Sequence, residues 1–488
     1  MINVEALKNK VLDLAMHGKL VAQDPQDEPA SALVEKIKKE KAQLIKDKKI
    51  KKAKPLPPIE ENEIPYEIPD SWKWVRLGNY ANIIRGGSPR PIKQYLTDSS
   101  NGINWIKIGD TKKNNKYIVS TLEKINKSGL KKTRYVKKNT LLLTNSMSFG
   151  RPYILKIDGA IHDGWLALSE YENYYDQNFL YYLLSSNFIF KQFKKSAKGS
   201  TVKNLNKDRV ALTMVPLFSL QEQQRIVDKI EEIFAELDKL DEASQKYDEC
   251  KELLNKRVLD LAMHGKLVAQ VPQDEPVSSL VEKIKEEKAQ LIKDKKIKKT
   301  KALPPIGEDE IPYEIPDSWE WVRLGDIVRF ENGDRGKNYP GKKYWIDSGI
   351  PFLNSGSLDG MGGIDSKKIN YISEERFGLL RSGFIKKNDI LYTLRGSVGK
   401  VGINNITQGA IASSLVIIRP IGMNPMYLLN VFMSTLNFAF LNKFKNGSAQ
   451  PNLSVKFLMK FMVPLPPQQE QQRIVDKIEE IFDALKEI

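Results

Sequence analysis

A long internal repeat constrains the fold of this chain more than any other feature. Residues 11–78 recur at 258–325 with 59 of 68 positions identical. The repeated segments bracket two stretches of unlike sequence, 79–220 and 326–468. At 488 residues the chain also exceeds what one hydrophobic core usually supports. We therefore expect two related halves, in which one repeated frame holds two different inserts.

The charge balance points to a polyanionic partner. The chain has 77 Lys and Arg against 61 Asp and Glu, a net charge of +16, which favours nucleic acid or an anionic membrane. The sequence contains no run of eighteen apolar residues, the length needed to span a bilayer. Its amphipathic start, with Glu5 and Asp13, is unlike a secretory signal. One cysteine, Cys250, and three histidines cannot build a zinc finger or a disulfide framework. We expect a cytoplasmic protein without metal or redox chemistry.

An apolar heptad pattern marks the central frame helix. From Ile226 to Leu261, apolar or tolerated residues alternate four and three positions apart. This period of 3.5 predicts a helix that pairs in a left-handed coiled coil, with Gly265 as its C-terminal cap. A helix of roughly 45 residues would be on the order of 65 Å long. Such a helix would separate two domains.

A second copy of this helix is divided between the chain termini. The 14 residues from Gln221 recur from Gln469, and the apolar pattern continues at Leu7 and Leu14, with one heptad, 241–247, missing. We expect the C-terminal and N-terminal helices to lie end to end and antiparallel to the central helix, with circularly permuted pseudo-twofold symmetry. The alternative is two independent amphipathic helices, each packed on its own domain.

Two further repeated segments follow each frame helix. The Lys-rich stretches 28–54 and 275–301 could touch phosphates, or they could be solvated helices with Glu and Lys three or four residues apart. Next come Pro-rich straps that cannot continue a helix. They end in tryptophans that we expect to be packing anchors: Trp72, Trp74, Trp319 and Trp321.

The inserts have the pattern of two diverged α/β domains. Short β-like runs are followed by a helical stretch, from Asn178 to about Lys195 in the first insert and from Pro425 to about Asn442 in the second. The predicted fold class is α+β, with two related α/β domains separated by long antiparallel coiled-coil helices.

Loops between the β-like runs carry side chains suited to reading base edges. Arg can donate two hydrogen bonds to guanine, Asn and Gln can bridge adenine, and Ser or Thr can serve either. For each such residue the alternative is an ordinary solvated loop side chain. The candidates in the first insert are Arg85, Ser88, Arg90, Lys93, Asn145, Ser146 and Arg151, with Lys198, Ser200 and Lys203 better suited to phosphate. The candidates in the second insert are Arg335, Lys337, Asn338, Asn354, Ser355, Arg395, Ser397 and Lys400, with Ser448 and Gln450.

Motifs of a self-sufficient DNA enzyme are missing from the sequence. A methyltransferase or nuclease needs a cofactor loop and a cluster of catalytic acids or an Asn-Pro-Pro-aromatic motif, and none is present. The glycines of GGSPRP and RGSVGK lack P-loop spacing. We expect no catalytic residue and no metal ligand on this chain.

Taken together, two related reader domains and near-identical helical spacers in circular permutation resemble the specificity subunit of type I restriction-modification systems. The resemblance covers essentially the full chain. It rests on LDLAMHGKLV, IPDSWEWVRLG, GGSPRP with INWIKIGD, NGSAQPNLS and MVPLPPQQEQQRIVDKIEEIF.

This resemblance implies a non-catalytic subunit that recognises a bipartite DNA target, one half-site per insert, with a spacer set by the helical frame. The half-site centres would lie about one helical turn apart, near 34 Å. The implied domain boundaries are distal spacer helix 1–20 and 469–488, Lys-rich helix and strap 21–70 and 267–317, target-recognition domains 71–220 and 318–468, and central spacer helix 221–266.

The resemblance also implies partners. These are double-stranded DNA, two methyltransferase (modification) subunits and restriction subunits, with no membrane. No cofactor is expected on this chain, whereas S-adenosylmethionine, ATP and Mg²⁺ are expected on the partner subunits. The coiled-coil frame would dock the modification subunits through Ile226, Ile230, Ile233, Leu237 and Leu240.

Three other functions fit the residues less completely. A tandem DNA-binding scaffold outside restriction, such as a transcription or partition factor, would lack a methyltransferase partner. An interaction adaptor would not bind DNA in its complex. A remote, unrecognised enzyme would bind S-adenosylmethionine as an isolated chain.

Overall fold

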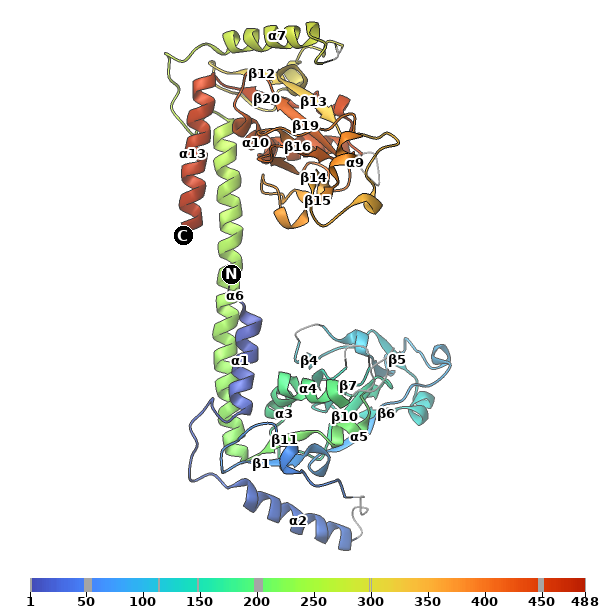
Figure 1. Cartoon of the computed structure of the whole chain (residues 1–488). Helices are drawn as coiled ribbons and strands as arrows, with labels where there is room; N and C mark the ends of the chain where they lie inside the picture. Colours follow the sequence, from blue (N-terminus) through green and yellow to red (C-terminus); the bar gives the residue numbers. More distant parts are fainter. Residues whose placement is uncertain are drawn as a thin grey trace. The chain divides into compact units, whose positions relative to one another are not determined.

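The computed structural model describes residues 2–47, 55–112, 115–146, 149–196, 205–297, 299, 301–445 and 452–487. The chain forms two compact units, Met1–Lys246 (unit 1) and Tyr247–Ile488 (unit 2), each with its own sheets and helices (Figure 1).

Unit 1 combines short strands with a few helices. Its helices are α1 (Val4–Met16), α2 (Ala30–Lys46), α3 (Gln177–Ser185), α4 (Asn187–Ser196), α5 (Lys207–Ala211) and the first part of α6 (Leu220–Met263). Its strands are β1 (Lys73–Arg76), β2 (Asn82–Arg85), β3 (Ile103–Ile106), β4 (Tyr117–Ile118), β5 (Glu123–Ile125), β6 (Arg134–Val136), β7 (Leu141–Thr144), β8 (Pro152–Leu155), β9 (Gly159–Ile161), β10 (Trp165–Ser169) and β11 (Met214–Leu217).

Unit 2 repeats this plan. Besides the last part of α6, its helices are α7 (Val277–Lys293), α8 (Leu324–Ile327), α9 (Glu374–Gly378), α10 (Pro425–Met433), α11 (Thr435–Lys445), α12 (Val455–Leu458) and α13 (Gln468–Glu487). Its strands are β12 (Glu320–Arg323), β13 (Val328–Asn332), β14 (Ile350–Leu353), β15 (Asn370–Ile372), β16 (Ile390–Thr393), β17 (Val401–Ile403), β18 (Ala410–Ile411), β19 (Leu415–Pro420) and β20 (Met462–Leu465).

The sheet topologies show that the two inserts are related. The order β2-β10-β7-β8-β4 in unit 1 corresponds to β13-β19-β16-β17 in unit 2, and β5-β3-β9-β6 corresponds to β15-β14-β18. In both units a separate two-stranded sheet pairs a strand of the frame with the last strand of the insert, β1-β11 or β12-β20. Unit 1 carries the additional edge strands β4 and β6. The prediction of two diverged α/β domains is therefore confirmed.

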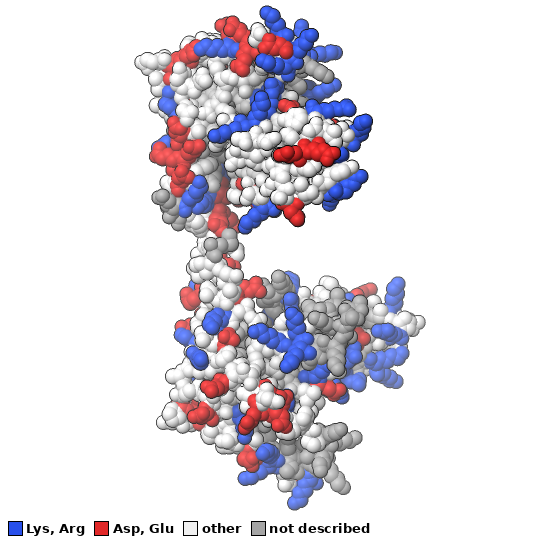
Figure 2. All heavy atoms as spheres, viewed as in Figure 1, with Lys and Arg blue, Asp and Glu red and all other residues white. Residues whose placement is uncertain are grey.

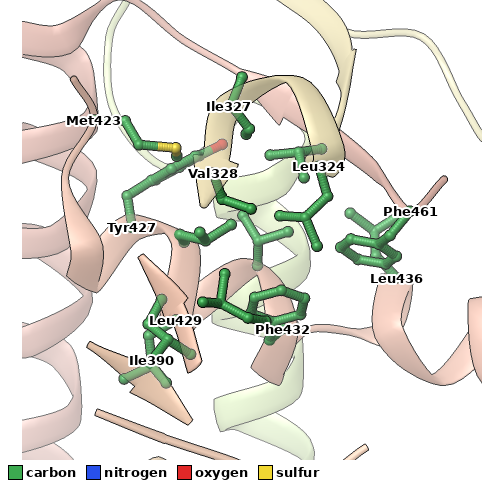
Figure 3. Packing of buried hydrophobic residues seen from close by; sticks show 14 of the residues in the cluster. Leu324, Ile327, Val328, Ile390, Met423, Tyr427, Leu429, Phe432, Leu436 and Phe461 are labelled. Carbon is green, nitrogen blue, oxygen red and sulfur yellow. The ribbon is translucent and has the colours of Figure 1, made fainter. Parts of the chain in front are cut away.

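The main core of unit 2 lies where the central sheet meets α10, α11 and the frame. Figure 3 shows Leu324, Ile327 and Val328 packed against Tyr427 and neighbouring residues of α10. Tyr427 is fully buried, and its hydroxyl donates a hydrogen bond to the carbonyl of Pro464 at 2.7 Å. A buried phenol needs such a partner, so the polar end of this side chain is satisfied inside the core.

Helix α6 contributes to the cores of both units. Ile226 and Ile230 are fully buried in unit 1, and Val258 and Leu259 are buried in unit 2. The heptad prediction of one continuous helix is confirmed by its bounds, Leu220–Met263. Within unit 1, α1 lies along the first part of α6, and within unit 2, α13 lies along its last part (Figure 1). The expected end-to-end arrangement of the terminal helices concerns both units together and stays a prediction.

Glycines end the two equivalent frame helices. Gly265 follows α6 with φ +65°, and Gly18 follows α1 with φ +66°. The amide of Lys266 donates to the carbonyl of Leu261 at 2.8 Å, which closes the last turn with the hydrogen bond of a left-handed cap. The predicted cap at Gly265 is confirmed.

A chain of polar contacts joins the strap to the frame helix in each unit. Ser71 Oγ donates to Gln23 Oε1 at 2.9 Å, and Gln23 Nε2 donates to Glu222 Oε1 at 2.6 Å. Burial raises the pKa of the Glu222 carboxyl above its ordinary value. Unit 2 repeats both contacts at 2.7 Å with Ser318, Gln270 and Glu470.

A partly buried ion pair adds to this junction. Arg225 binds both carboxylate oxygens of Asp27, with the shorter contact at 2.6 Å, and Arg473 binds Asp274 in the same way. The two-point geometry fixes the position of each guanidinium. The duplicated sequence therefore builds the same frame junction twice.

The four strap tryptophans pack as predicted. Trp72 is buried and stacks on Phe218 with ring centroids 3.8 Å apart. Trp74 meets Tyr66 edge to face at 5.1 Å. In unit 2, Trp319 is buried and Trp321 meets Tyr313 at 5.1 Å.

The helical stretch expected in each insert is confirmed, and the structure divides each stretch into two helices. Ser186 separates α3 from α4, and Ser434 separates α10 from α11, both with extended backbone. The Ser186 hydroxyl donates to the carbonyl of Leu183 at 2.7 Å and accepts from the amide of Ile189 at 3.3 Å. A serine side chain that satisfies backbone groups in this way ends one helix and caps the next.

Candidate nucleic-acid interface

The same tight turn follows the central strand of both units. In unit 1 Thr144 ends β7, its Oγ1 accepts from the amide of Arg151 at 2.9 Å, and Gly150 donates to its carbonyl at 2.7 Å. Thr393 plays the same part in unit 2, where Lys400 donates to its Oγ1 at 2.8 Å. We call these segments the β7–β8 turn and the β16–β17 turn.

Side chains of the two turns differ, although equivalent hydrogen bonds close both turns. The carbonyl of Asn145 accepts from Leu205 at 2.8 Å, as the carbonyl of Leu394 accepts from Leu453 at 3.0 Å. These contacts make Asn145 equivalent to Leu394, so that Ser146 is equivalent to Arg395. The turn therefore presents a small hydroxyl in unit 1 and a cation in unit 2.

Four predicted residues of unit 1 converge on Asp163, which follows β9. Ser88 Oγ donates to Asp163 Oδ1 at 2.8 Å, and Arg90 lies 3.8 Å from Oδ2. Asn145 Nδ2 and Arg85 Nε donate to the Asp163 carbonyl at 2.8 and 3.1 Å. The structure thus brings together residues that are up to 78 positions apart in the sequence.

The charge of Asp163 is stabilised by this cluster. Partial burial opposes its ionisation, but the Ser88 hydroxyl, His162, Arg85 and Arg90 together hold the pKa of its carboxyl below the ordinary value. Asp163 therefore carries a negative charge at neutral pH at the centre of an otherwise cationic loop cluster.

Asn145 corrects the predicted reading set. Asn145 is only 4% exposed, and its amide is already hydrogen bonded to the Asp163 carbonyl. A side chain that is enclosed in this way supports the loop and does not present its amide to solvent. The other predicted residues of this insert within the described ranges, Lys93, Ser146 and Arg151, are exposed or half-buried.

In unit 2 the corresponding loops line an open hollow of about 610 Å³. Arg335 lines it from the loop after β13, and Arg395 lines it from the β16–β17 turn. Both arginines are exposed, and within the described residues neither guanidinium has a hydrogen bond or an ion pair. The other lining residues are Asn332, Gly333, Leu394, Asn452, Leu453, Ser454, Val455 and Lys456.

The backbone around Arg335 is held in place by a buried carboxylate. Asp334 accepts from the amides of Gly336 at 2.6 Å and Arg381 at 2.9 Å, and these amides hold the pKa of the Asp334 carboxyl below its ordinary value. Asn338 Nδ2 donates to the Leu379 carbonyl at 3.2 Å. The loop is therefore fixed while the Arg335 side chain stays available.

Behind this loop lies an ion network that unit 1 lacks at the equivalent positions. Arg419 binds both oxygens of Asp389, at 2.5 and 2.6 Å, and Glu331 at 2.9 Å. Glu331 also accepts from the amides of Gly383 and Phe384. The network joins β13, β16 and β19 to the segment that carries Arg381.

The remaining predicted residues of unit 2 take different positions. Asn354 caps a short 3₁₀ turn by accepting from the amide of Gly356 at 2.7 Å, and the amide of Ser355 donates to Ser414 Oγ at 3.4 Å. Lys337, Ser397 and Lys400 are exposed. The predicted phosphate or base contacts at Lys198, Ser200, Lys203, Ser448 and Gln450 lie outside the described residues.

Charge is unevenly distributed over the visible face. In Figure 2, many Lys and Arg side chains lie on the β-sheet side of unit 2, around one patch of Asp and Glu, and further Asp and Glu side chains gather beside α13. Among the described residues, no helix combines the length and apolar character of a membrane span. Within the same ranges no three His, Cys, Asp or Glu side chains come together as a metal site.

The structure corrects two residues of the predicted docking surface. Ile226 and Ile230 are fully buried in the core of unit 1, so they are occupied by the chain's own packing. Ile233 and Leu237 are half-buried, and Leu240 is 39% exposed. The apolar stripe therefore becomes accessible only from Ile233 onward.

Sequence reasoning missed Asp163 and the hollow residues Asn332, Asn452, Ser454 and Lys456. Asp163 lies in AIHDGWLALS, which aligns with AIASSLVIIR of the second insert. The alignment places Asp in the first insert opposite Ser in the second, and this difference in charge could have marked the position. The hollow residues lie in or beside matched landmarks whose role is visible only after the loops are brought together.

Comparison with known proteins agrees with this architecture. A family described as "Type I restriction modification DNA specificity domain" matches the chain twice, at residues 69–246 and 316–488. The type I restriction enzyme EcoAI specificity subunit of Escherichia coli is 30% identical, over 99% of this chain and 90% of its own length. The EcoEI specificity subunit of the same species is 27% identical over the same shares.

A solved structure shares the fold. It is described as the structural basis underlying complex assembly and conformational transition of the type I R-M system, and it matches with a TM-score of 0.59 and 20% identity over 86% of this chain and 93% of that chain. Because the family description matches both inserts and the EcoAI relative covers nearly the whole chain, this protein belongs to the family of type I restriction-modification specificity subunits, whose catalytic activities lie in partner subunits.

Proposed function

We propose that the chain recognises a bipartite double-stranded DNA target, with unit 1 and unit 2 each reading one half-site. The observation that carries this proposal is the pair of matching turns with unlike side chains. Two recognition domains whose turns are closed by the same hydrogen bonds, but which present Ser146 in one case and Arg395 in the other, are suited to two different base sequences.

Phosphate contacts would position the readers. The net charge of +16 and exposed cations near the turns, among them Arg90, Lys93, Lys400 and Lys456, supply the electrostatic attraction that DNA binding requires. Base discrimination would then come from the shorter-range contacts of the loops. This role requires access to the cell's DNA, which fits the cytoplasmic location expected from the sequence.

The duplicated frame supports two equivalent docking positions for methyltransferase subunits. The junctions around Asp27 with Arg225 and Asp274 with Arg473 have matching geometry, so the frame surfaces beside them are built alike. A partner that binds one copy can bind the other. We propose two modification subunits docked on this frame together with restriction subunits, and S-adenosylmethionine, ATP and Mg²⁺ bound by those partners.

Helix α6 would set the distance between the half-sites. It is one uninterrupted helix whose first part is buried in the core of unit 1 and whose last part is buried in the core of unit 2. A continuous helix rises by about 1.5 Å per residue and resists bending, so it can act as a spacer. We propose half-site centres about one DNA turn apart.

The proposal is tested by co-expressing the full chain with the modification subunit of its own system and mapping methylated adenines across the genome. We expect one motif made of two specific parts and a spacer of fixed length and free sequence. A single contiguous motif would contradict the two-reader function. The absence of a methyltransferase among proteins that co-purify with the chain would favour a scaffold outside restriction-modification.

A further inference from the structure

The hollow of unit 2 differs from the matching region of unit 1 in its charge. None of the described residues that line it carries a carboxylate, and three of them, Arg335, Arg395 and Lys456, are cations. Asp334 lies beside the hollow, but backbone amides bind its carboxylate. The hollow is therefore suited to a group that offers several hydrogen-bond acceptors.

Building on the proposed function, we infer that unit 2 reads guanine in its half-site, with Arg335 and Arg395 as the specificity-determining residues. Guanine presents two acceptors, O6 and N7, in the major groove, and the planar guanidinium can donate to both at once. Cytosine presents an amino donor at the same edge, which a carboxylate would accept. The described lining of the hollow is cationic and offers no carboxylate for this donor.

Fixed loops favour a base-reading role over a loose phosphate contact. Asp334 holds the backbone around Arg335. The turn that carries Arg395 is closed by the bond from Lys400 to Thr393 and by Gly399, which has φ +93°. Both arginines thus stand on ordered backbone, which reduces the conformational entropy that binding must remove.

Free guanidinium groups also favour binding. Neither Arg335 nor Arg395 has a protein partner among the described residues, so no internal ion pair has to break when DNA arrives. The guanidinium of Arg419, by contrast, is already bound by Asp389 and Glu331. The two hollow arginines are the available ones.

Unit 1 provides an internal comparison. A Cβ on Gly86 would clash with the carbonyls of residues 161 and 162, and one on Gly333 would clash with those of 411 and 412, so the two glycines are equivalent. Counting from them, Ser88 stands where unit 2 has Arg335. Ser146 likewise stands where unit 2 has Arg395. Unit 1 therefore has a serine at both positions and is expected to read its half-site differently.

The test uses the full chain in complex with its modification subunit and compares wild type with Arg335→Gln and Arg395→Gln. Adenine methylation mapping identifies the motif, and binding is then measured on duplexes in which each guanine in turn is replaced by 7-deazaguanine, which lacks the N7 acceptor. We expect wild-type affinity to fall about 10- to 100-fold at one or two guanines of one half-site only.

Each Gln variant should lose its preference for guanine at one of those positions and leave the other half-site unchanged. Arg395→Lys should retain part of the preference, because lysine keeps the charge but not the fork. Lys456→Gln is the matched control. We expect it to weaken binding to all DNA sequences alike and to reduce the slope of log affinity against log salt concentration by about 1.

Two results would overturn the inference. One is that Arg335→Gln and Arg395→Gln behave like Lys456→Gln, with uniform loss on all sequences, which would assign the arginines to phosphates. The other is that no 7-deazaguanine position in the half-site affected by these variants changes affinity. A wild-type complex with no bipartite motif would instead contradict the proposed function itself.

Discussion

Equivalent hydrogen bonds close the β7–β8 turn of unit 1 and the β16–β17 turn of unit 2, but the loops around the two turns differ in charge. In unit 1, Asp163 places a carboxylate among Arg85 and Arg90. In unit 2, Arg335 and Arg395 stand unpaired in a hollow whose described lining has no acid. The comparison teaches that the fold fixes the positions of these loop side chains, while the residue type at each position sets the local charge. Under the proposed function, that difference decides which bases each unit reads.

The strands below these loops differ as well. Ile84 in β2 is partly buried in an apolar cluster, whereas the aligned Glu331 in β13 pairs with Arg419 and accepts two backbone amides. Unit 1 therefore supports its loop by apolar packing, and unit 2 supports its loop by buried charges.

Removing the cation of this network should give the largest effect. Arg419→Ala leaves Asp389, whose side chain is 1% exposed, without its charge partner. Breaking one side of a buried ion pair typically costs about 3–5 kcal/mol. We expect a loss of that size in the free energy of unfolding of unit 2, measured by urea denaturation, with hydrogen exchange to locate it. Ser169→Ala at the aligned position of unit 1 should cost less than about 0.5 kcal/mol, and equal losses in both variants would remove the distinction.

The shared turn can be tested at its glycine in both units. A Cβ on Gly399 would lie 2.2 Å from Leu441, and one on Gly150 would lie 2.8 Å from Phe193, and both glycines have positive φ. Gly→Ala at either position should destabilise its own unit by about 1–3 kcal/mol. Gly109→Ala, where a Cβ meets nothing within 4 Å, is the control. A large loss in only one unit would show that the turns are not equivalent.

The sequence predicted the frame well because its signals are local and periodic. The heptads around Ile226 to Leu261 correspond to α6, and Gly265 ends it as expected. The breaks at Ser186 and Ser434 were missed because a serine inside an apolar helical pattern carries no strong stop signal.

The candidate site was only partly predictable. Arg335 and Arg395 were chosen by residue type, but their meeting in one hollow depends on strand pairing between distant segments. Asp163 was not selected, because acidic residues do not suggest DNA contact until their basic neighbours are known. The burial of Ile230 likewise depends on the insert packed against it.

Neutralising Asp163 should make unit 1 more like unit 2. Asp163→Asn removes the negative charge beside Arg85 and Arg90. Arg90 then has no carboxylate beside it, and the positive charge of both arginines becomes available to phosphates, although Arg85 keeps its hydrogen bond to the backbone carbonyl of residue 163. We expect a several-fold gain in affinity for nonspecific DNA at low salt, with a steeper salt dependence and weaker discrimination in one half-site. Asp98→Asn changes the net charge equally at an exposed residue. An identical gain from Asp98→Asn would show a net-charge effect and not a local one.

The smallest expected effect concerns the frame, where both units have an equivalent buried glutamate, Glu222 or Glu470. Burial raises the pKa of the Glu222 and Glu470 carboxyls above the ordinary 4.5. The folded state then binds more protons than the unfolded state above pH 4.5, so these groups stabilise the fold less as pH rises through their folded pKa. Thermal unfolding of the wild type, of Glu222→Gln and of Glu470→Gln is measured across pH. As the pH rises, the wild type should lose stability relative to each variant, and this difference should then level off. A difference that does not change with pH in either variant would contradict the raised pKa.

The central claim, that one helical frame spaces two independent readers, is tested most directly by lengthening α6. Duplicating the heptad 241–247 adds about 10 Å along the helix axis and nearly preserves its rotational phase, which corresponds to about three base pairs of DNA at 3.4 Å each. Methylation mapping of this variant with its modification subunit should show both half-sites unchanged and a spacer longer by about three base pairs. An unchanged spacer, or altered half-sites, would contradict the account.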